Sequence, residues 1–317
     1  MIQTGTPYPL VGVGFSMHPN WARGLPSLRD LLDPLREAGL TALEFELNPN
    51  DPTWPEFRPL MKACREMGYR LCFHAPYRPP TSIAGFAGEK GEEIARFLAP
   101  LYHIAAEYGP TTLVVHGATS RHSSSESDRS RPAAAGRSAT HTHDLLQADT
   151  IALLDWALDE YPTLTLALEN LNPVPDVIKV GDNRAEVLHI VREIEHPNLG
   201  ICWDIGHDVN AGRAEAPGPL WLRQVRHVHI HDLDDTGQDH FPLIYGRVRP
   251  GHWLPPLLRT GFDGIITLEL NGQRCGFLWP DRIMPALVDS IAMIANAIRG
   301  SQQTHAPGRS GSGEDRA

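Results

Sequence analysis

The sequence contains no stretch approaching the ~20 uninterrupted apolar residues that a membrane-spanning helix needs. Nothing at the start of the chain predicts export, because that segment lacks a basic region, a long apolar run and a cleavage site. The four cysteines form no CxxC pair, and such isolated thiols are typical of the reduced state in a cytosolic protein. We therefore expect a cytoplasmic protein without disulfides and without a membrane partner.

Lysine is scarce: the sequence has only Lys62, Lys90 and Lys179, and none of them is in a strand-like run. A Schiff-base aldolase needs an amine inside its site, so this enzyme class is disfavoured. The 28 basic and 38 acidic residues give a net charge of −10, whereas nucleic-acid backbones are normally bound by clustered Lys and Arg. The composition therefore argues against nucleic acid as a partner.

Short β-branched runs alternate with segments of helical periodicity along most of the chain. The predicted strands are Val11–Phe15, Ala42–Leu47, Arg70–His74, Thr112–His116, Leu164–Glu169, Gly200–Asp204, Arg226–His231 and Gly264–Leu270. The predicted helices are Leu25–Ala38, Glu56–Met67, Glu92–Tyr108, Leu145–Glu160, Arg184–Ile194 and Ile283–Arg299. Such alternation is typical of a TIM barrel or a doubly wound sheet, and no G-x-G-x-x-G supports the latter. We expect an α/β fold, a single-domain (β/α)8 TIM barrel over residues 8–299.

Two segments fall outside this pattern. Residues 119–142, after the fourth predicted strand, are rich in Ser, Ala and Arg, and residues 300–317 are polar. Segments of this composition bury too little apolar surface to offset their chain entropy. We expect a low-complexity, disordered insertion and a disordered C-terminal tail.

Histidines and acids stand at the carboxyl ends of six consecutive predicted strands. They are His74, His116, Glu169, Asp204, a histidine of the seventh strand, and Glu269. In a barrel these ends meet at one mouth, where active sites are built. Three carboxylates in one pocket repel one another unless a cation neutralises them. Because mixed imidazole and carboxylate ligands suit zinc, manganese or cobalt, the sequence predicts a divalent-metal site.

Periodicity leaves two choices open. Along the seventh strand His227, His229 and His231 share one face, so alternation cannot select the ligand. His227 lies deepest and is expected in the core or behind a ligand, whereas His231 could orient a ligand through its second ring nitrogen. Glu44 and Glu46 also share a face, and one is expected to line the cavity while the other pairs internally.

Six short motifs stand at these strand ends. They are HAPY at His74–Tyr77, VVHG at Val114–Gly117, LEN at Leu168–Asn170, DIGH at Asp204–His207, HIHD at His229–Asp232 and LEL at Leu268–Leu270. Together they resemble the xylose-isomerase-like TIM-barrel superfamily, which includes sugar phosphate isomerases and epimerases and the endonuclease IV family. The resemblance covers nearly the whole barrel, although any one motif alone would be weak.

This resemblance implies a central metal held by four residues. They are Glu169, Asp204, His229 and Glu269. It selects His229 over His231 because the family's ligand lies three residues before an aspartate, here Asp232. It also implies that Glu169 and Glu269 are catalytic and exchange protons on opposite faces of a ketose.

The two branches of the superfamily imply different roles for other residues. In the epimerase branch His207 contacts the substrate, whereas in the endonuclease IV branch His74 and His116 bind a second metal. In the latter branch His207 also joins a later Asp-Arg-His in holding a third metal. Residues 238–246 resemble the D-x-H-L-P-L-G-x-G of sugar isomerase relatives more closely, but Gln238 replaces the aspartate and Ile244 the first glycine. A third metal site is complete only if Asp239 substitutes for the missing aspartate.

Three further residues are predicted to bind substrate. Glu46 matches an acidic position common in sugar isomerase relatives, and His231 follows His229 on the same face. His240 is either a contact of the substrate or a metal, or a residue of a surface loop.

We expect a divalent-metal-dependent sugar isomerase or epimerase that moves a proton on a small polyol or ketose through a metal-stabilised enediolate. The rival hypothesis is an endonuclease IV-like phosphodiesterase that uses two or three zinc ions on a small phosphodiester or nucleic acid. A third is a binding protein with a vestigial metal site. The acidic net charge favours a neutral sugar as the small-molecule partner, and a homo-oligomer stays open.

Overall fold

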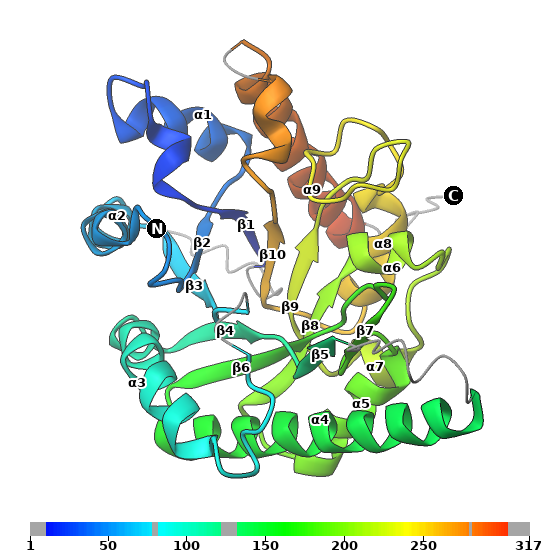
Figure 1. Ribbon diagram of the computed structural model, residues 1–317. Coiled ribbons are helices and arrows are strands. Elements are labelled where there is room, and N and C mark those ends of the chain that lie inside the picture. The colour runs from blue at the N-terminus through cyan, green and yellow to red at the C-terminus, as the bar shows by residue number, and fades with distance from the viewer. Residues whose placement is uncertain (1–10, 78–81, 122–131, 279–280, 304–317) are drawn as a thin grey trace, which may run out of the picture.

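Eight parallel strands form a closed barrel in this computed structural model, which describes residues 11–77, 82–121, 132–278 and 281–303 (Figure 1). The strands are β1 (Gly12–Ser16), β2 (Ala42–Glu46), β3 (Arg70–His74), β4 (Thr111–Val115), β6 (Leu164–Glu169), β8 (Leu199–Asp204), β9 (Val225–Ile230) and β10 (Ile265–Leu268). They are hydrogen-bonded in the order β1-β10-β9-β8-β6-β4-β3-β2. Each predicted strand overlaps one of them, so the predicted TIM barrel is confirmed.

Helices lie between the strands and surround the barrel (Figure 1). They are α1 (Leu28–Ala38), α2 (Trp54–Glu66), α3 (Gly91–Glu107), α4 (Pro132–Glu160), α5 (Arg184–Ile194), α6 (Ile205–Asn210), α7 (Pro219–Leu222), α8 (Pro250–Leu258) and α9 (Ile283–Gln303), with 3-10 turns η1 (Pro19–Ala22) and η3 (Arg274–Leu278). The sequence did not predict α6, α7 or α8. Two of these are short, and α8 contains three prolines, which disfavour a helix prediction.

Alternation along each strand separates an apolar layer from a polar one. On β2, Leu43 and Phe45 belong to the large core cluster under the helices, whereas Glu44 faces the barrel interior. The interior has only small apolar clusters, such as Val114 with Ala167 and Cys202. The room left in the interior is occupied by buried carboxylates and imidazoles, which continue up to the carboxyl ends of the strands.

The segment predicted as an insertion is partly ordered. Thr119–Arg121 form strand β5, which pairs antiparallel with β7 (Val177–Lys179), and α4 already begins at Pro132. Residues 122–131, the middle of the predicted insertion, lie outside the described residues. Lys179 therefore belongs to a strand, contrary to the expectation that no lysine does. Strands of only three residues give too little alternation to be recognised in a sequence.

The C-terminal helix α9 extends beyond the predicted start of the tail, and residues 304–317 lie outside the described part. Within the described residues, Ile283–Ser301 is long and apolar enough to cross a membrane, with a mean hydropathy of 1.3. Its residues Leu287, Ile291 and Ile294 are buried where α9 packs against α1 and α8. Core packing thus accounts for the apolar positions of this helix.

Candidate metal centre

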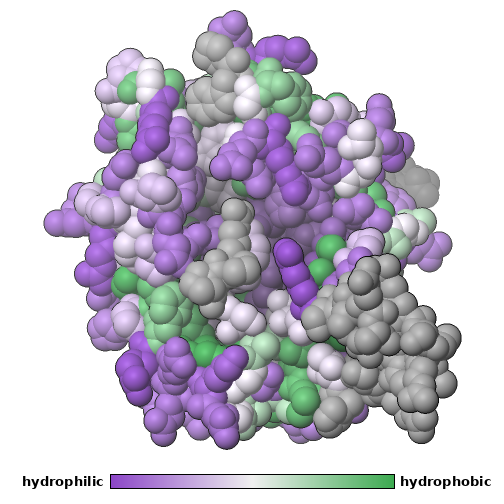
Figure 2. Space-filling model, viewed as in Figure 1, coloured by the Kyte–Doolittle hydropathy of each residue, from purple (hydrophilic) through white to green (hydrophobic). Residues whose placement is uncertain are grey.

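The four predicted ligands of the central metal come together at the mouth of the barrel. Ligand atoms of Glu169, Asp204, His229 and Glu269 all lie within 4.8 Å of one another. The parallel register brings this about, because Asp204 on β8 is paired with His229 on β9, and Thr267 on β10 is paired with the same histidine. Hydrophilic residues gather around a central hollow on this face (Figure 2).

Two buried atoms of this group lack the hydrogen bonds that such atoms normally have. His229 Nδ1 and Glu269 Oε2 have no hydrogen-bond partner among the described residues, although they lie only 3.3 Å apart. Buried polar atoms are rarely left without a partner. One imidazole and three carboxylates around a common point are a donor set that fits zinc, manganese or cobalt.

Glu169 connects this group to a second one. Its Oε2 atom lies 3.3 Å from His74 Nε2 and 3.1 Å from His116 Nε2. The pKa of Glu169, which burial alone would raise, is held well below its usual range by the nearby His116 and His229. His74 Nδ1 donates to the carbonyl of Ala75 at 2.7 Å, so Nε2 is the atom available to a ligand. The structure thus brings His74 and His116 together with Glu169, and their role as ligands of a second metal stays a prediction.

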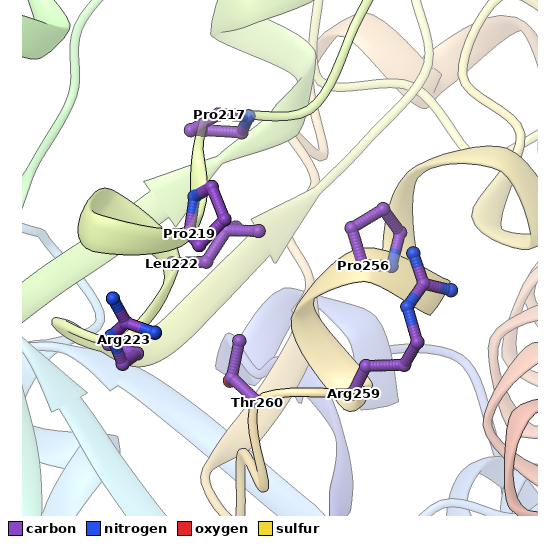
Figure 3. A pocket seen from close by; sticks show the side chains of 7 residues that line it. All are labelled: Pro217, Pro219, Leu222, Arg223, Pro256, Arg259 and Thr260. Carbon is purple, nitrogen blue, oxygen red and sulfur yellow. The ribbon is translucent and has the colours of Figure 1, made fainter. Parts of the chain in front are cut away.

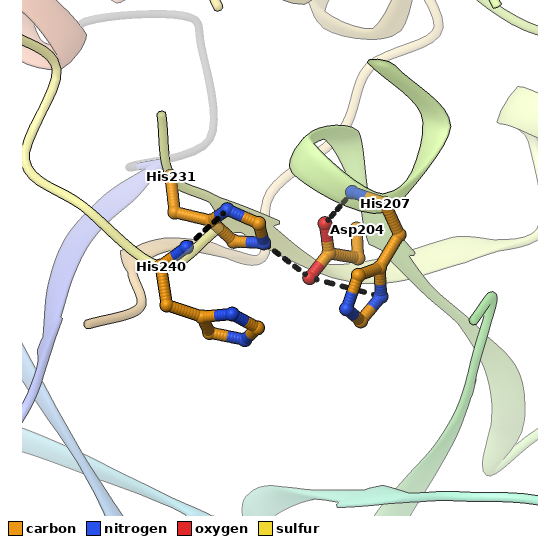
Figure 4. Close-up of side chains that lie close together, drawn as sticks. All are labelled: Asp204, His207, His231 and His240. Atoms are coloured by element: carbon orange, nitrogen blue, oxygen red, sulfur yellow. Dashed lines mark hydrogen bonds and ion pairs between the residues drawn. The ribbon is translucent and has the colours of Figure 1, made fainter. Parts of the chain in front are cut away.

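A third group lies on the other side of Asp204 (Figure 4). Asp204 caps α6 by accepting the backbone N–H of His207 at 2.6 Å, and its Oδ2 lies 3.2 Å from His231 Nε2. The backbone N–H of His240 donates to His231 Nδ1 at 3.1 Å. His231 therefore holds Asp204 through one ring nitrogen, and its predicted contact with substrate stays a prediction.

His240 lies in the site rather than on a surface loop. Its Nε2 is 3.3 Å from Glu269 Oε2, and its Nδ1 is 2.8 Å from Asp239 Oδ1. Asp239 also binds Arg274. It is not part of the potential metal group formed by Asp204, His207, His231 and His240. Gln238, at the position of the family aspartate, donates its backbone N–H to Asp234 Oδ1 at 2.9 Å.

The structure separates the roles of the two acids on β2. Glu44 is 3% exposed and pairs with His227 and His229, so it is the internally paired residue. Glu46 is paired in register with His74 at the mouth, and its Oε1 is buried without a hydrogen-bond partner among the described residues. Its predicted role in substrate binding stays a prediction.

Two residues that support the site were not predicted. Asn170 donates to the carbonyl of Asp204 at 2.9 Å and accepts its backbone N–H at 2.8 Å, which holds the end of β8. Asp232 accepts backbone N–H groups from residues 245–248 and so fixes the segment that follows His240. Asn170 is in the LEN motif and Asp232 is in the HIHD motif. Their roles were not predicted because the partner of Asn170 is distant in sequence and the partners of Asp232 lie in a loop.

A cavity away from the mouth has no such ligands. It measures about 460 Å³ and lies between α7 and α8, near the amino ends of β9 and β10 (Figure 3). Its lining consists of Pro217, Pro219, Leu222, Arg223, Pro256, Arg259 and Thr260. We assign the chemistry to the mouth.

The imidazoles predict a pH dependence of stability. Burial lowers the pKa of His240, but Glu269 and Asp239 outweigh it and raise the pKa to about 10; Glu169 likewise raises the pKa of His74 to about 9. Raised pKa values stabilise the fold fully below the unfolded value of about 6.5, and this contribution is lost as pH rises through 9 to 10. We expect the Tm of the chelator-treated protein to fall by about 5 °C or more between pH 7 and 10.

The control for this pH dependence is the same protein saturated with manganese or zinc. General effects of alkali act on both forms, so the fall in Tm should be clearly smaller when metal is bound. Parallel Tm curves for the two forms would contradict the assignment of the raised pKa values to this site.

Comparisons with known proteins agree with the barrel. The family described as "Xylose isomerase-like TIM barrel" matches residues 32–296. A D-tagatose 3-epimerase-like protein has a similar structure, with a TM-score of 0.61 over 93% of this chain and 100% of its own at 19% identity. A D-allulose 3-epimerase from Methylomonas sp., in complex with D-allulose, has a TM-score of 0.57 over 93% and 98% at 16% identity. At these identities the likeness shows the fold.

One curated relative is closer in sequence over a shorter segment. An uncharacterised protein from Methanocaldococcus jannaschii is 33% identical over 114 residues, which are 35% of this chain and 38% of that protein. The match thus spans well under half of the relative's length.

Proposed function

The chain belongs to the xylose isomerase-like TIM-barrel family, and from this premise we propose that it is a divalent-metal-dependent isomerase or epimerase of a small sugar, ketose or polyol. One observation carries the proposal. Two glutamates, Glu169 at the end of β6 and Glu269 directly after β10, share a pocket with Asp204 and His229, with all four ligand atoms within 4.8 Å of one another.

The residues of the proposed metal site are Glu169, Asp204, His229 and Glu269, and the metal is manganese, zinc or cobalt. Such a cation would act as a Lewis acid that polarises vicinal oxygens of the substrate and offsets the negative charge that develops when a proton is removed. The described carboxylates and imidazoles are the groups that position the substrate and move the proton.

Glu169 and Glu269 are the proposed bases. They stand on either side of Asp204 and His229, since β8 and β9 separate β6 from β10 in the barrel wall. Burial alone would raise the pKa of Glu269, but His229 and His240 hold it well below its usual range. The pKa of Glu169 is lowered in the same way by His116 and His229. Both are therefore ionised near neutral pH and able to accept a proton from opposite sides of a bound ketose.

Histidines around these carboxylates are the proposed contacts of sugar hydroxyls. His207 Nδ1 donates to the carbonyl of Asn170 at 3.0 Å and lies 3.3 Å from Glu169 Oε1, so its Nε2 is the atom left for a hydroxyl. His240 Nε2 lies 3.3 Å from Glu269 Oε2. Each imidazole is thus beside one of the proposed bases, where it can orient a hydroxyl.

The endonuclease IV-like alternative has its own supporting observation. His74, His116 and Glu169 form a second potential metal group, and Asp204, His207, His231 and His240 form a third. Carboxylates shared between neighbouring groups are what a site with two or three zinc ions needs. Such sites stabilise both the attacking and the leaving oxygen in a phosphoryl transfer. The net charge of −10 disfavours a nucleic-acid backbone as the substrate.

Metal stoichiometry and turnover distinguish these functions. Purified protein is analysed for bound metal and assayed against a ketose panel and a phosphodiester with a chromogenic leaving group. We expect about one essential metal per chain and epimerisation or isomerisation of a ketose. Two or three zinc ions with cleavage of the phosphodiester would contradict the proposal, and tight sugar binding without any turnover would indicate the binding protein instead.

A further inference from the structure

A buried carboxylate lies beneath the proposed metal centre. Glu44, in the middle of β2, reaches across the barrel interior and contacts two histidines of β9. Its Oε1 lies 2.9 Å from His229 Nε2, and its Oε2 lies 2.7 Å from His227 Nε2. Glu44 is 3% exposed and both histidines are fully buried, so water does not compete for these contacts.

These contacts define where each imidazole carries its proton. An ionised carboxylate only accepts hydrogen bonds, so the Nε2 atoms of His227 and His229 must both donate. Neutral His229 then has its lone pair on Nδ1. That atom lies 3.3 Å from Glu269 Oε2 and 3.6 Å from Glu169 Oε2, and it has no hydrogen-bond partner in the described part of the chain.

We propose that Glu44 is a positioning residue that holds His229 in the Nε2–H tautomer and aims Nδ1 at the metal. This inference rests on the metal centre of the proposed function. Carboxylates that accept the second N–H of a metal-bound histidine fix its ring orientation and raise its basicity. Here Glu44 is the accepting carboxylate, and it reaches His229 from β2, which is separated from β9 by β10 and β1.

His227 holds the other oxygen of the Glu44 carboxylate. Its Nε2 donates to Glu44 Oε2 and also lies 3.0 Å from Thr267 Oγ1 on β10. A glutamine at position 44 has a single acceptor oxygen, so it can serve only one of the two imidazoles. The other would face an N–H2 group, which for His229 favours the tautomer with its proton on Nδ1.

The test compares the metal affinities of two variants, each changed at one buried residue that contacts His227. Glu44→Gln keeps the shape of the side chain but removes one acceptor, whereas Thr267→Val removes the hydroxyl beside His227 Nε2 and leaves the contact between Glu44 and His229 in place. Affinity for Mn²⁺ and Zn²⁺ is measured by chelator competition, and folding of the metal-free proteins by circular dichroism. We expect Glu44→Gln to bind about 10- to 100-fold more weakly and Thr267→Val to stay within about threefold of wild type.

A second readout needs no variant. Long-range ¹H–¹⁵N spectra of histidine-labelled, metal-loaded wild-type protein report the tautomer of His229, which we expect to be Nε2–H. A proton on Nδ1, or equal affinities of wild type and Glu44→Gln, would overturn this inference while leaving the proposed function intact. A wild-type protein that binds neither cation would overturn the proposed metal centre and this inference with it.

Discussion

Replacing Glu169 or Glu269 by glutamine is expected to lower kcat on the best ketose substrate by about 10³-fold or more. Each substitution removes a base and one of the anionic ligands, while the neighbouring imidazoles keep their places around an amide of the same shape. KM should change much less, because hydroxyl contacts through His207 and His240 are retained. The measurement is steady-state kinetics at saturating manganese, with metal content determined for every variant.

Metal content separates the two roles of these glutamates. A variant that still binds metal and has lost kcat has lost proton transfer, and it should still exchange substrate hydrogen with deuterated water on the side of the intact glutamate. Glu193→Gln on the exposed face of α5 serves as the control and should have wild-type kinetics. Wild-type rates in both Glu169→Gln and Glu269→Gln would remove the catalytic assignment.

The barrel and most of its site could be predicted because topology converts chain position into spatial position. In a closed parallel barrel every carboxyl end lies at the same mouth, so residues as far apart in sequence as His74 and Glu269 could be assigned to one pocket. The alternation of buried and interior positions gave the strand boundaries to within a few residues. Short elements such as β5 and β7 escaped prediction because their pairing depends on tertiary register rather than on local pattern.

The finer geometry of the site could not be predicted for the same physical reason. Strand alternation predicts that His227, His229 and His231 share one face, but it does not predict which residue each of them contacts. In the structure, His227 and His229 both contact Glu44, and His229 also faces the candidate centre. His231 contacts Asp204 instead. Glu44 lies 183 residues from His227 along the chain. Their contact depends on the distance across the barrel interior, which the local sequence pattern does not specify.

Asp208, behind the mouth, is expected to contribute more to stability than any exposed charge. It is fully buried in α6, where it accepts hydrogen bonds from Trp203 Nε1 at 2.6 Å, Arg213 Nη1 at 2.8 Å and Arg184 Nε at 2.9 Å. Asn170, which holds the end of β8, also donates to it at 3.3 Å. One carboxylate therefore pairs with two guanidinium groups and connects them to the residue that supports Asp204.

Asp208→Asn is expected to lower the free energy of unfolding by about 3 to 5 kcal/mol, because it leaves two guanidinium groups without their counter-charge. The corresponding fall in Tm is about 10 °C, measured by calorimetry alongside urea unfolding. Asp159→Asn, on the exposed side of α4, is the control and should change stability by less than about 0.5 kcal/mol. Because Arg184 and Arg213 are 19% and 27% exposed, partial hydration favours the lower end of this range. A loss below about 1 kcal/mol would mean that water replaces the carboxylate at both guanidinium groups, and that Asp208 does not hold the wall behind Asp204.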